Sequence, residues 1–438
     1  MSPSEAAVIG FHLLRTKRGL RFASRHQLEA WQAVRIARFL RVLASVPFYR
    51  GCAGRDLSAL PVMNKARMLE HFTSLNGAGI TLEHASRIAD RAERSRDFSP
   101  TIGDYTVGLS SGTSGPRGVF LVSGRERARW AGVMLGRTLT AAHLRRMLAP
   151  GGVPLRVAFF LRANSNLYQT LTSSRIDFRF FDLHAGVDPH LPALDRLAPD
   201  VLVAPARVLT YLADRREKGA IHVQPSRVIS VAEVLEPDDA RRIEAAFGQP
   251  VHQLYQCTEG FLGFTCEHGV LHLNEEYVHI EPEWLDESRT RFRPIVTDFS
   301  RTTQPIVRYR LDDVLRVRSA PCRCGRHTMA LEAIDGRCDD ILWFQSAHGG
   351  QSRPVFPDIL RHALTTAAVP GDYRIVQNGD RLRVSCSHPA DGAYPAIRAA
   401  LEGLADRHGL CLPALASEDW REIPWEHKRR RIVCEQHG

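Results

Sequence analysis

The sequence predicts an α/β protein with a large N-terminal domain, in which mixed β-sheets are flanked by helices, and a small α+β C-terminal domain. Three observations support this prediction. Short apolar runs alternate with amphipathic stretches between residues 104 and 300. This alternation ends near residues 339–340, where the pattern changes. A chain of 438 residues is also longer than a single small core usually needs.

The N-terminal region begins with helix. Apolar residues recur at spacings of three and four between Leu28 and Leu43, so residues 1–50 are expected to be mostly helical until Pro47 breaks the pattern. A loop-rich stretch follows. Strands are then expected at 105–109, 157–161, 177–182, 201–204, 227–231 and 251–255, and helices at 123–139, 192–195, 206–217 and 237–247.

The C-terminal region has a different order of elements. Strands are expected at 341–344, 373–377 and 381–385, and helices at 357–366 and 394–409. We therefore expect an N-terminal domain of residues 1–336 and a mobile C-terminal domain of residues 341–438, joined by a hinge at 337–340.

Composition limits the class of protein. Hydrophobic residues make up 44% and charged residues 24%, which is ordinary for a globular protein. No apolar run is as long as a membrane span, and the N-terminus does not have the pattern of a secretory signal. Nine irregularly spaced cysteines indicate reduced thiols rather than a disulfide framework. We expect a cytoplasmic protein with no membrane partner.

The net charge of +10 and the sequence pI of about 9.4 favour phosphorylated or acidic partners. The basic residues are scattered, apart from the run at 428–431, and no aromatic platform lies among them, so we expect no nucleic-acid partner. The oligomeric state is left open, with a homodimer as one option.

The most informative segment is LSSGTSGPRG at residues 109–118, which follows an expected strand. Glycines let backbone N–H groups approach an anion, and hydroxyl groups add donors, so such a turn can bind phosphates. It is not a Walker motif, because no Gly-Lys-Ser/Thr closes it. A solvated surface loop has the same composition and remains the alternative.

Four further segments place polar residues at the ends of expected strands or at the junction between the domains. They are VISVAE at 228–233, LYQCTEG at 254–260, IVRYRLDD at 306–313 and GRCDD at 336–340. Taken singly, each acid is also explained as a helix cap or a turn residue.

In this order, the segments resemble the adenylate-forming superfamily over residues 109–433, specifically its phenylacetate–CoA ligase-like branch. The nearest subgroup is described only as adenylate-forming, is related to synthetases that adenylylate a deazaflavin cofactor, and shares the FFLRANSN stretch at 159–166. Each motif is weak by itself, but the ordered set is specific.

The resemblance implies an ATP site with bound Mg²⁺. Residues implied to hold the β- and γ-phosphates are Ser110, Ser111, Gly112, Thr113, Ser114 and Gly115. Residues implied to line the adenine pocket are Ser230, Ala232 and Glu233, with Tyr255 near the base or the acyl group. Thr258 would contact the α-phosphate, and Glu259 would hold the Mg²⁺.

Four implied residues lie further along the chain. Asp313 matches the ribose-binding aspartate, or Asp312 if the register slips by one, and Arg337 would contact the ribose or a phosphate. Asp339 would lie at the hinge, and Lys428 has the position of the C-terminal catalytic lysine. The alternative for Lys428 is a solvated basic tail. The sequence departs from the family pattern at Arg117, where lysine is frequent, and at His427, where glycine is usual.

The implied reaction joins a small carboxylic acid to ATP, giving an acyl adenylate and pyrophosphate, and then transfers the acyl group to a thiol. Because two anions must meet, Mg²⁺ and a lysine are suited to neutralise the charge. The thiol would belong to coenzyme A or to the phosphopantetheine of an acyl carrier protein. The alternatives are an amide- or ester-forming ligase, an adenylyltransferase that leaves AMP on its product, and a non-catalytic nucleotide-binding relic.

The acid is expected to be aromatic, by analogy with the branch. Candidate residues for its pocket are Phe159, Phe160, Asn164, Asn166 and Tyr168. An apolar strand followed by a polar turn explains these residues equally well.

Cysteine spacing predicts a metal site. Cys322 and Cys324 form a C-x-C knuckle, and Cys266 and His272 lie upstream with five residues between them. Together they fit a tetrahedral Cys₃His zinc site with a structural role, because four protein ligands leave no open position. Similar arrangements in the resembling branch support this set. His268 could replace His272, and four unrelated buried residues remain the alternative.

Overall fold

The computed structural model describes residues 2–52, 54–110, 117–164 and 166–435. The chain forms two compact units. The first contains Met1–Glu283, Pro294–Leu311 and Val317–Ala333, and the second contains Trp284–Arg293, Asp312–Arg316 and Ile334–Gly438. Within the described ranges, no helix is both long enough and apolar enough to span a bilayer.

The first unit is built on a mixed sheet, as the sequence predicts. Its strands follow the order β10-β9-β8-β7-β6-β4-β5. Neighbouring strands pair in parallel along the row β5, β4, β6, β7, β8. They pair antiparallel along the row β8, β9, β10. The bounds are β4 (Leu155–Leu161), β5 (Ile176–Asp182), β6 (Val201–Pro205), β7 (Arg227–Val231), β8 (Val251–Cys257), β9 (Gly260–Thr265) and β10 (Leu271–Leu273).

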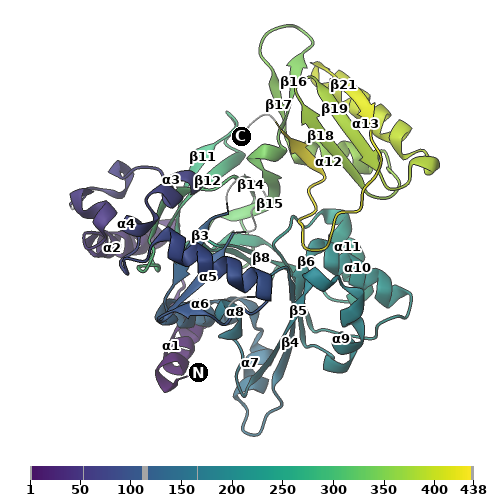
Figure 1. Cartoon of the computed structure of the whole chain (residues 1–438). Helices are drawn as coiled ribbons and strands as arrows, with labels where there is room; N and C mark the ends of the chain where they lie inside the picture. Colours follow the sequence, from purple (N-terminus) through teal and green to yellow (C-terminus); the bar gives the residue numbers. More distant parts are fainter. Residues whose placement is uncertain (1, 53, 111–116, 165, 436–438) are drawn as a thin grey trace. The chain divides into compact units, whose positions relative to one another are not determined.

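Helices cover both faces of this sheet, with α10 and α11 on one side and α6 and α8 on the other (Figure 1). All five residues of β6 are buried, as expected for a parallel strand covered on both faces. The helices are α6 (Gly124–Thr138), α7 (Ala141–Leu148), α8 (Asn166–Gln169), α9 (Leu191–Leu197), α10 (Ala206–Glu217) and α11 (Pro237–Phe247).

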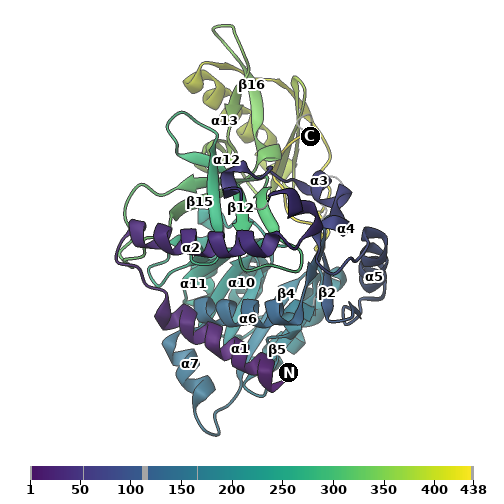
Figure 2. The same ribbon diagram turned by 90° about the vertical axis from the view of Figure 1, so that its left-hand side faces the viewer.

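The N-terminal region is mostly helical, as the sequence predicts, but it is divided into two helices. Helix α1 (Pro3–Leu14) continues as a short π-helix, η1 (Arg15–Gly19), and α2 (Arg25–Leu43) starts anew after Ser24, whose side chain accepts a hydrogen bond from the N–H of Gln27. Both helices lie at the front of the first unit in Figure 2.

The remaining elements before residue 123 form a helical segment and a small antiparallel sheet of order β1-β2-β3. They are α3 (Lys65–Glu70), α4 (Phe72–Leu75), α5 (Leu82–Ser95), β1 (Thr101–Ile102), β2 (Tyr105–Leu109) and β3 (Val119–Val122). Five more strands follow β10, and all but β13 contribute residues to both units: β11 (His279–Trp284), β12 (Arg291–Asp298), β13 (Ile306–Arg310), β14 (Asp313–Val317) and β15 (Ala330–Arg337).

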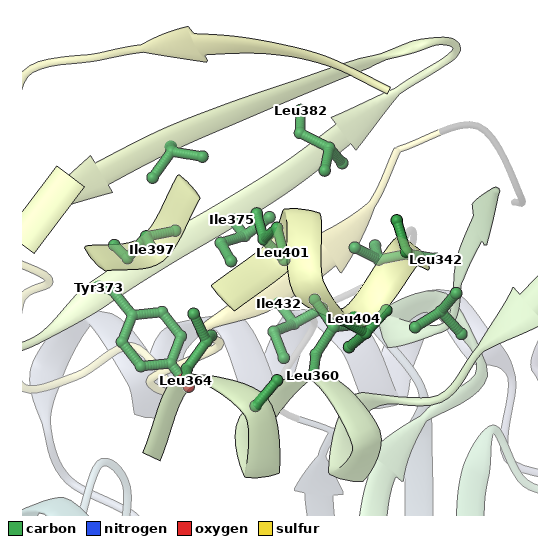
Figure 3. Packing of buried hydrophobic residues seen from close by; sticks show 14 of the residues in the cluster. Leu342, Leu360, Leu364, Tyr373, Ile375, Leu382, Ile397, Leu401, Leu404 and Ile432 are labelled. Atoms are coloured by element: carbon green, nitrogen blue, oxygen red, sulfur yellow. The ribbon is translucent and has the colours of Figure 1, made fainter. Parts of the chain in front are cut away.

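The second unit packs two sheets and two helices around one core. Its strands are β16 (Leu342–Ser346), β17 (Arg353–Val355), β18 (Tyr373–Asn378), β19 (Arg381–Cys386), β20 (Leu410–Cys411), β21 (Ala414–Ser417) and β22 (Ile432–Cys434), and its helices are α12 (Pro357–Thr366) and α13 (Ala393–His408). Alternate residues of β18 and β19, such as the paired Ile375 and Val384, face this core. Figure 3 shows Ile375 in this core together with Leu360 and Leu401.

Candidate functional site

The carboxyl ends of β7 and β8 lie side by side. The two strands pair in parallel, with Ser230 opposite Gln253 and Val231 opposite Leu254. The residues that follow each strand therefore emerge at the same edge of the sheet, which is where ligands bind in open α/β sheets. These are the residues that the sequence assigns to the adenine and the α-phosphate.

The end of β7 is unusual in its backbone and its polar contacts. Ala232 has a φ of +65°, which is rare for a residue with a side chain. Ser230 is 2% exposed, and its hydroxyl oxygen has no hydrogen-bond partner in the part of the chain that the structure describes. Glu233 accepts a hydrogen bond of 3.0 Å from the N–H of Arg207 at the start of α10. A strained residue beside an unsatisfied hydroxyl is typical of a binding site.

Thr258 and Glu259 form the two-residue turn between β8 and β9, where Cys257 pairs with Gly260. The hydroxyl of Thr258 donates to Oε2 of Glu259 over 3.0 Å. Glu259 is 8% exposed. Asp298 lies close by, since a Cβ at position 260 would be 3.2 Å from its Oδ2, and burial raises the pKa of Asp298. The turn thus presents hydroxyl and carboxylate oxygens, the ligands that Mg²⁺ prefers.

The base of the glycine-rich loop is an extension of the β2–β3 hairpin. The N–H of Ser110 donates to the carbonyl of Gly118 over 2.8 Å, and the N–H of Gly118 donates to the Ser110 hydroxyl over 2.7 Å. Arg117 donates to the carbonyl of Ser110 over 3.1 Å and forms a 2.6 Å ion pair with Glu93. Of the predicted phosphate-binding residues, Ser111, Gly112, Thr113, Ser114 and Gly115 lie outside the described residues.

Arg301 connects this hairpin to the turn at Thr258. Its Nη1 donates to the carbonyl of Thr258 over 2.6 Å, and its Nη2 donates to the carbonyl of Leu121 in β3 over 3.1 Å. Gln304 adds a second link, because its Oε1 accepts from the N–H of Leu121 over 2.8 Å. The sequence analysis missed both residues, since isolated polar residues in an expected loop carry no pattern.

Aromatic side chains lie near the same edge. The ring of Tyr168 is 4.7 Å from that of Phe159 and 5.9 Å from that of Trp130, measured between centroids. Trp130 donates from Nε1 to Oε1 of Gln256 over 3.3 Å, which connects this cluster to β8. Burial raises the pKa of Tyr168 to about 12. Trp130 is a further residue that the sequence analysis did not identify.

Other predicted pocket residues have different surroundings. Phe160 is fully buried and stacks on Phe181 with 4.6 Å between ring centroids, as a core residue does. Tyr255 is 7% exposed. Asn164 follows β4 at the same edge as Ala232, and the side chain of Asn166 lies outside the described atoms. Their contact with an acid stays a prediction.

In the second unit, arginines and aspartates form a connected cluster. Arg337 contacts Asp312 over 3.2 Å and Asp339 over 3.8 Å, while Asp312 also pairs with Arg293. Burial alone would lower the pKa of Arg337, but the neighbouring carboxylates, Asp339 first, raise it. Gly336 has a φ of +129°, and a Cβ there would lie 2.8 Å from Asp340, so only glycine fits.

The C-terminal tail joins this cluster through Arg430, which the sequence analysis did not identify. Arg430 forms a 2.9 Å ion pair with Asp339 and also binds Asp340. Burial raises the pKa of Asp340. Lys428 is exposed, two residues before this arginine. Asp313 begins β14.

Four predicted metal ligands come together in the first unit. The ligand atoms of Cys266, His272, Cys322 and Cys324 all lie within 4.8 Å of one another. The sulfurs of Cys266 and Cys322 are 3.7 Å apart, and the sulfur of Cys324 is 3.4 Å from Nε2 of His272. His268 is exposed and is not part of this cluster.

Local structure explains how these ligands converge. Cys266 and His272 flank the turn between β9 and β10, and Gly269 allows this turn with a φ of +77°. The knuckle closes through the N–H of Gly325, which donates to the carbonyl of Cys322 over 3.2 Å. Nδ1 of His272 contacts the hydroxyl of Thr328 at 3.1 Å, a partner that orients the ring as in metal sites.

Comparison with known proteins gives a fold. No protein-family model matches the chain, and no curated protein matches it. The crystal structure of 2-hydroxyisobutyryl-CoA ligase in the postadenylation state with 2-HIB-AMP has a TM-score of 0.63 at 17% identity, covering 96% of this chain and 92% of that chain. An open conformation of that ligase, with 2-HIB-AMP and CoA, has a TM-score of 0.53 at 18% identity, covering 92% of this chain and 91% of that chain.

A structure of a different kind of enzyme shares the same architecture. The acyl acid amido synthetase AtGH3.15 in complex with 2,4-DB has a TM-score of 0.51 at 14% identity, covering 88% of this chain and 81% of that chain. At these identities the likeness shows the fold alone, which the chain shares with that CoA ligase and with the amido synthetase. The predicted fold class is confirmed, whereas the branch stays a prediction.

Proposed function

We propose that the protein activates a carboxylic acid with ATP, releasing pyrophosphate and forming an acyl adenylate, and then transfers the acyl group to a thiol. One observation carries the proposal. The residues after β7 and β8 emerge together, and Arg301 fastens the turn at Thr258 to the hairpin that bears the glycine-rich loop. In the adenylate-forming fold, this arrangement suits a nucleotide whose base and phosphates are bound by separate loops.

Each phosphate contact would have a defined source. Backbone N–H groups and hydroxyls of the loop at 110–118 would bind the β- and γ-phosphates, and Thr258 would donate to the α-phosphate. Glu259 would hold a Mg²⁺ ion, which neutralises phosphate charge when bound. Ser230, Ala232 and Glu233 would line the adenine pocket, and Ser230 has an unsatisfied hydroxyl available for it.

The second unit would supply the remaining groups. Asp313 would bind the ribose hydroxyls, and Arg337 the ribose or a phosphate, while Lys428 would bring a positive charge to the reacting carboxylate and phosphate oxygens. We propose Asp339 as the hinge residue, and the ion pair between Arg430 and Asp339 as a contact that changes when the hinge moves.

The acid itself would lie against Tyr168, Phe159 and Trp130. These rings offer an apolar surface, and Gln256 holds Trp130 in place through a hydrogen bond. Offset and edge-to-face contacts of this kind favour an aromatic acid. We propose coenzyme A or a carrier phosphopantetheine as the thiol, because the basic surface suits both.

We propose that the cluster of Cys266, His272, Cys322 and Cys324 holds a structural Zn²⁺ ion. Three sulfur ligands with one imidazole are typical of zinc, and four protein ligands leave no position for substrate. Metal analysis of the purified protein tests this proposal, with the Cys322→Ser/Cys324→Ser double variant as the comparison. The absence of zinc from the wild type would reject it.

Pyrophosphate release measured across a library of carboxylic acids, with and without coenzyme A, tests the reaction. Glu259→Gln is expected to lower kcat by about 10²-fold or more, because the developing phosphate charge loses its metal ligand. Glu217→Gln, which removes an exposed carboxylate at the end of α10, is the matched control and should leave kcat unchanged. Equal kcat values for the two variants would contradict the role of Glu259.

The same assay separates the alternatives. If acyl adenylate accumulates while coenzyme A is present, the acceptor is not that thiol, and amines, alcohols and carrier proteins are tested next. If AMP stays on the product, the protein is an adenylyltransferase. A Lys428→Ala variant with unchanged adenylation and transfer would favour a nucleotide-binding protein without catalysis.

A further inference from the structure

Positive charge is concentrated in the first 55 residues. This stretch contains ten lysines and arginines but only two acids, Glu5 and Glu29, while the whole chain has a net charge of +10. Most of the excess charge therefore lies on α1, η1, α2 and their flanks, which form one face of the first unit (Figure 2).

Two of these arginines gather around one tryptophan. The guanidinium carbon of Arg35 lies 4.1 Å from the centre of the Trp31 ring, and that of Arg15 lies 5.0 Å from it. Arg15 also lies 5.9 Å from the centre of the Phe11 ring. Stacking on aromatic rings holds the two guanidinium groups in place and leaves their N–H edges available for an anion.

A third arginine reaches the same place from α6. Arg129 is half-buried, lies 6.0 Å from the centre of the Tyr277 ring, and has a buried Nε without a hydrogen-bond partner. Nδ1 of His12, on α1, is likewise buried and unpartnered. Neither atom finds a partner in the described part of the chain, although buried polar groups are usually satisfied.

The arginines repel one another. Burial first, and then the charges of Arg15, Arg129 and Arg38, lower the pKa of Arg35. Burial, Arg129, Arg15 and Arg125 lower the pKa of His12 to about 4, so this ring is neutral at pH 7. Both shifts show that positive charge is crowded here.

Carboxylates do not neutralise this cluster. Across residues 2–52, 54–110, 117–164 and 166–435, no acid forms an ion pair with Arg15, Arg35 or Arg129. The two acids that act on Arg129 are otherwise engaged: Glu126 accepts from the N–H groups of Thr302 and Thr303, and Asp298 is buried beside Gly260. An anion from outside the chain would relieve the repulsion.

We propose that Arg15, Arg35 and Arg129, at the junction of η1, α2 and α6, bind a phosphate group. A phosphate accepts several hydrogen bonds at once, and guanidinium groups match its geometry in pairs. The ligand is a soluble phosphorylated molecule or the headgroup of a phospholipid, which share this chemistry.

The surface around the cluster bears on the source of the phosphate. Phe11, Leu14, Val34 and Val42, all on α1 and α2, are between 40% and 68% exposed. Exposed apolar residues beside arginines are typical of helices that lie on an anionic lipid surface. The experiment therefore includes a soluble arm and a lipid arm.

Inorganic phosphate is the soluble probe, titrated at constant ionic strength and followed by thermal unfolding, with a non-hydrolysable ATP analogue present throughout. Vesicles of phosphatidylcholine alone, or mixed with phosphatidylglycerol, are the lipid probe, followed by cosedimentation. In at least one arm, the Arg15→Gln/Arg35→Gln double variant is expected to bind about tenfold more weakly than the wild type, since each charge-assisted hydrogen bond contributes measurably.

The matched control is the Arg94→Gln/Arg145→Gln double variant. It removes the same charge from two exposed arginines outside the cluster and should bind like the wild type. Arg35→Lys, which keeps the charge but not the paired N–H geometry, should bind with intermediate affinity and guards against a folding defect in the double variant. Weaker phosphate binding assigns a soluble ligand, and weaker binding to phosphatidylglycerol vesicles alone assigns a lipid. Equal binding by the wild type and the Arg15→Gln/Arg35→Gln variant in both arms would overturn the proposal.

Discussion

Two of the arginines on helix α6, Arg129 and Arg137, have their charges balanced in opposite ways. The side chain of Arg137 is 1% exposed, and its Nη2 lies 2.8 Å from Oε2 of Glu276, a carboxylate that is 2% exposed. It also donates to Oδ1 of Asn274 over 3.0 Å and lies 4.0 Å from the centre of the Phe264 ring. Arg129, about two turns earlier in the helix, has only distant carboxylates.

This difference distinguishes an arginine whose charge is neutralised within the fold from an arginine whose charge is not. A buried charge must be paired, because its desolvation is otherwise too unfavourable. The charge of Arg137 is paired within the chain by Glu276, although its Nη1 has no hydrogen-bond partner among the described residues. Arg129 is only half-buried, and no carboxylate in the described part of the chain forms an ion pair with it. The pairing of a buried arginine thus distinguishes a structural role from a binding role.

The largest effect is expected when the ion pair between Arg137 and Glu276 is broken. Arg137→Gln should lower the free energy of unfolding by about 3 kcal/mol, because Glu276 is left buried with an incomplete partner. Arg129→Gln should change it by less than about 1 kcal/mol, since no ion pair is lost. Urea denaturation of both variants measures the difference. Similar losses in the two variants would show that Arg129 is as structural as Arg137.

The cluster of Cys266, His272, Cys322 and Cys324 provides the second test, because Arg326 connects it to the Arg137–Glu276 pair. Arg326 lies two residues after Cys324, 3.6 Å from Glu276 and 5.2 Å from the centre of the Phe264 ring. If the cluster binds the proposed Zn²⁺ ion, a chelator should lower the free energy of unfolding by about 2.7 kcal/mol from its value at a free zinc concentration of about 100 times the Kd.

The energetic coupling between the Arg137–Glu276 pair and the cysteine cluster can also be measured. The loss caused by Arg137→Gln should become smaller in the chelated protein, since both changes loosen Glu276 and Arg326. The effect of Arg129→Gln should stay the same with and without chelator. Urea denaturation of the wild type and of each variant, with and without chelator, measures both effects. If the effects of Arg137→Gln and of the chelator on the free energy of unfolding simply add, the link through Arg326 is contradicted.

The close packing of α1 on α6 provides a third test. Its expected effect on the free energy of unfolding is comparable to the effect of the chelator or smaller. A Cβ at Gly132 would lie 2.5 Å from the carbonyl oxygen of Ile9, so Gly132→Ala must push the two helices apart. We expect a loss of about 1–3 kcal/mol in the free energy of unfolding. The same shift would move Arg15 away from Arg129 and weaken phosphate binding, while the Arg137 pair stays intact.

Gly10→Ala is the matched control on the facing helix. A Cβ at Gly10 meets nothing within 4 Å, so this variant should be neutral or slightly stabilising, because alanine is the better helix former. Thermal unfolding of both variants compares them. A destabilising Gly10→Ala with a neutral Gly132→Ala would contradict the packing described for α1 and α6.

Patterns in the sequence predicted the features that depend on local spacing. The strands before Ala232 and Thr258 are apolar runs, and the C-x-C knuckle at Cys322 has a spacing that few other roles need. The fold class and the clustering of Cys266, His272, Cys322 and Cys324 could therefore be predicted from the sequence. The break between α1 and α2 could not, because the apolar spacing that predicts helix runs from Leu28 to Leu43 and does not show where the preceding helix ends.

Residues that act over long sequence distances left no such signal. Arg301 contacts carbonyl groups at positions 121 and 258, and Arg430 contacts Asp339, but neither partner can be inferred from neighbouring residues. The cluster of Arg15, Arg35 and Arg129 is similar, since an excess of arginine near the N-terminus does not say which ones meet around Trp31. Tertiary packing alone brings these charges together.

The smallest expected effect concerns the titration of His12. Its pKa is lowered from 6.5 to about 4 by burial and then by Arg129, Arg15 and Arg125, whereas His252 has a pKa of about 4 because of burial and Arg227. Arg129→Gln, or bound phosphate, should therefore raise the pKa of His12 by about 0.5 and leave that of His252 unchanged. Histidine ring signals in an NMR pH titration report both groups.

The sign of the matching stability change follows from proton linkage. His12 binds a proton more weakly in the folded chain than in the unfolded chain, so its contribution to stability is complete above pH 6.5 and is lost as the pH falls toward about 4. A higher pKa of His12 in the folded chain narrows the pH range between its folded and unfolded pKa values. The Arg129→Gln variant should therefore lose less stability on acidification than the wild type. Equal shifts at His12 and His252 would mean that burial alone sets both values, and that the arginines around Trp31 are too well solvated to form a site.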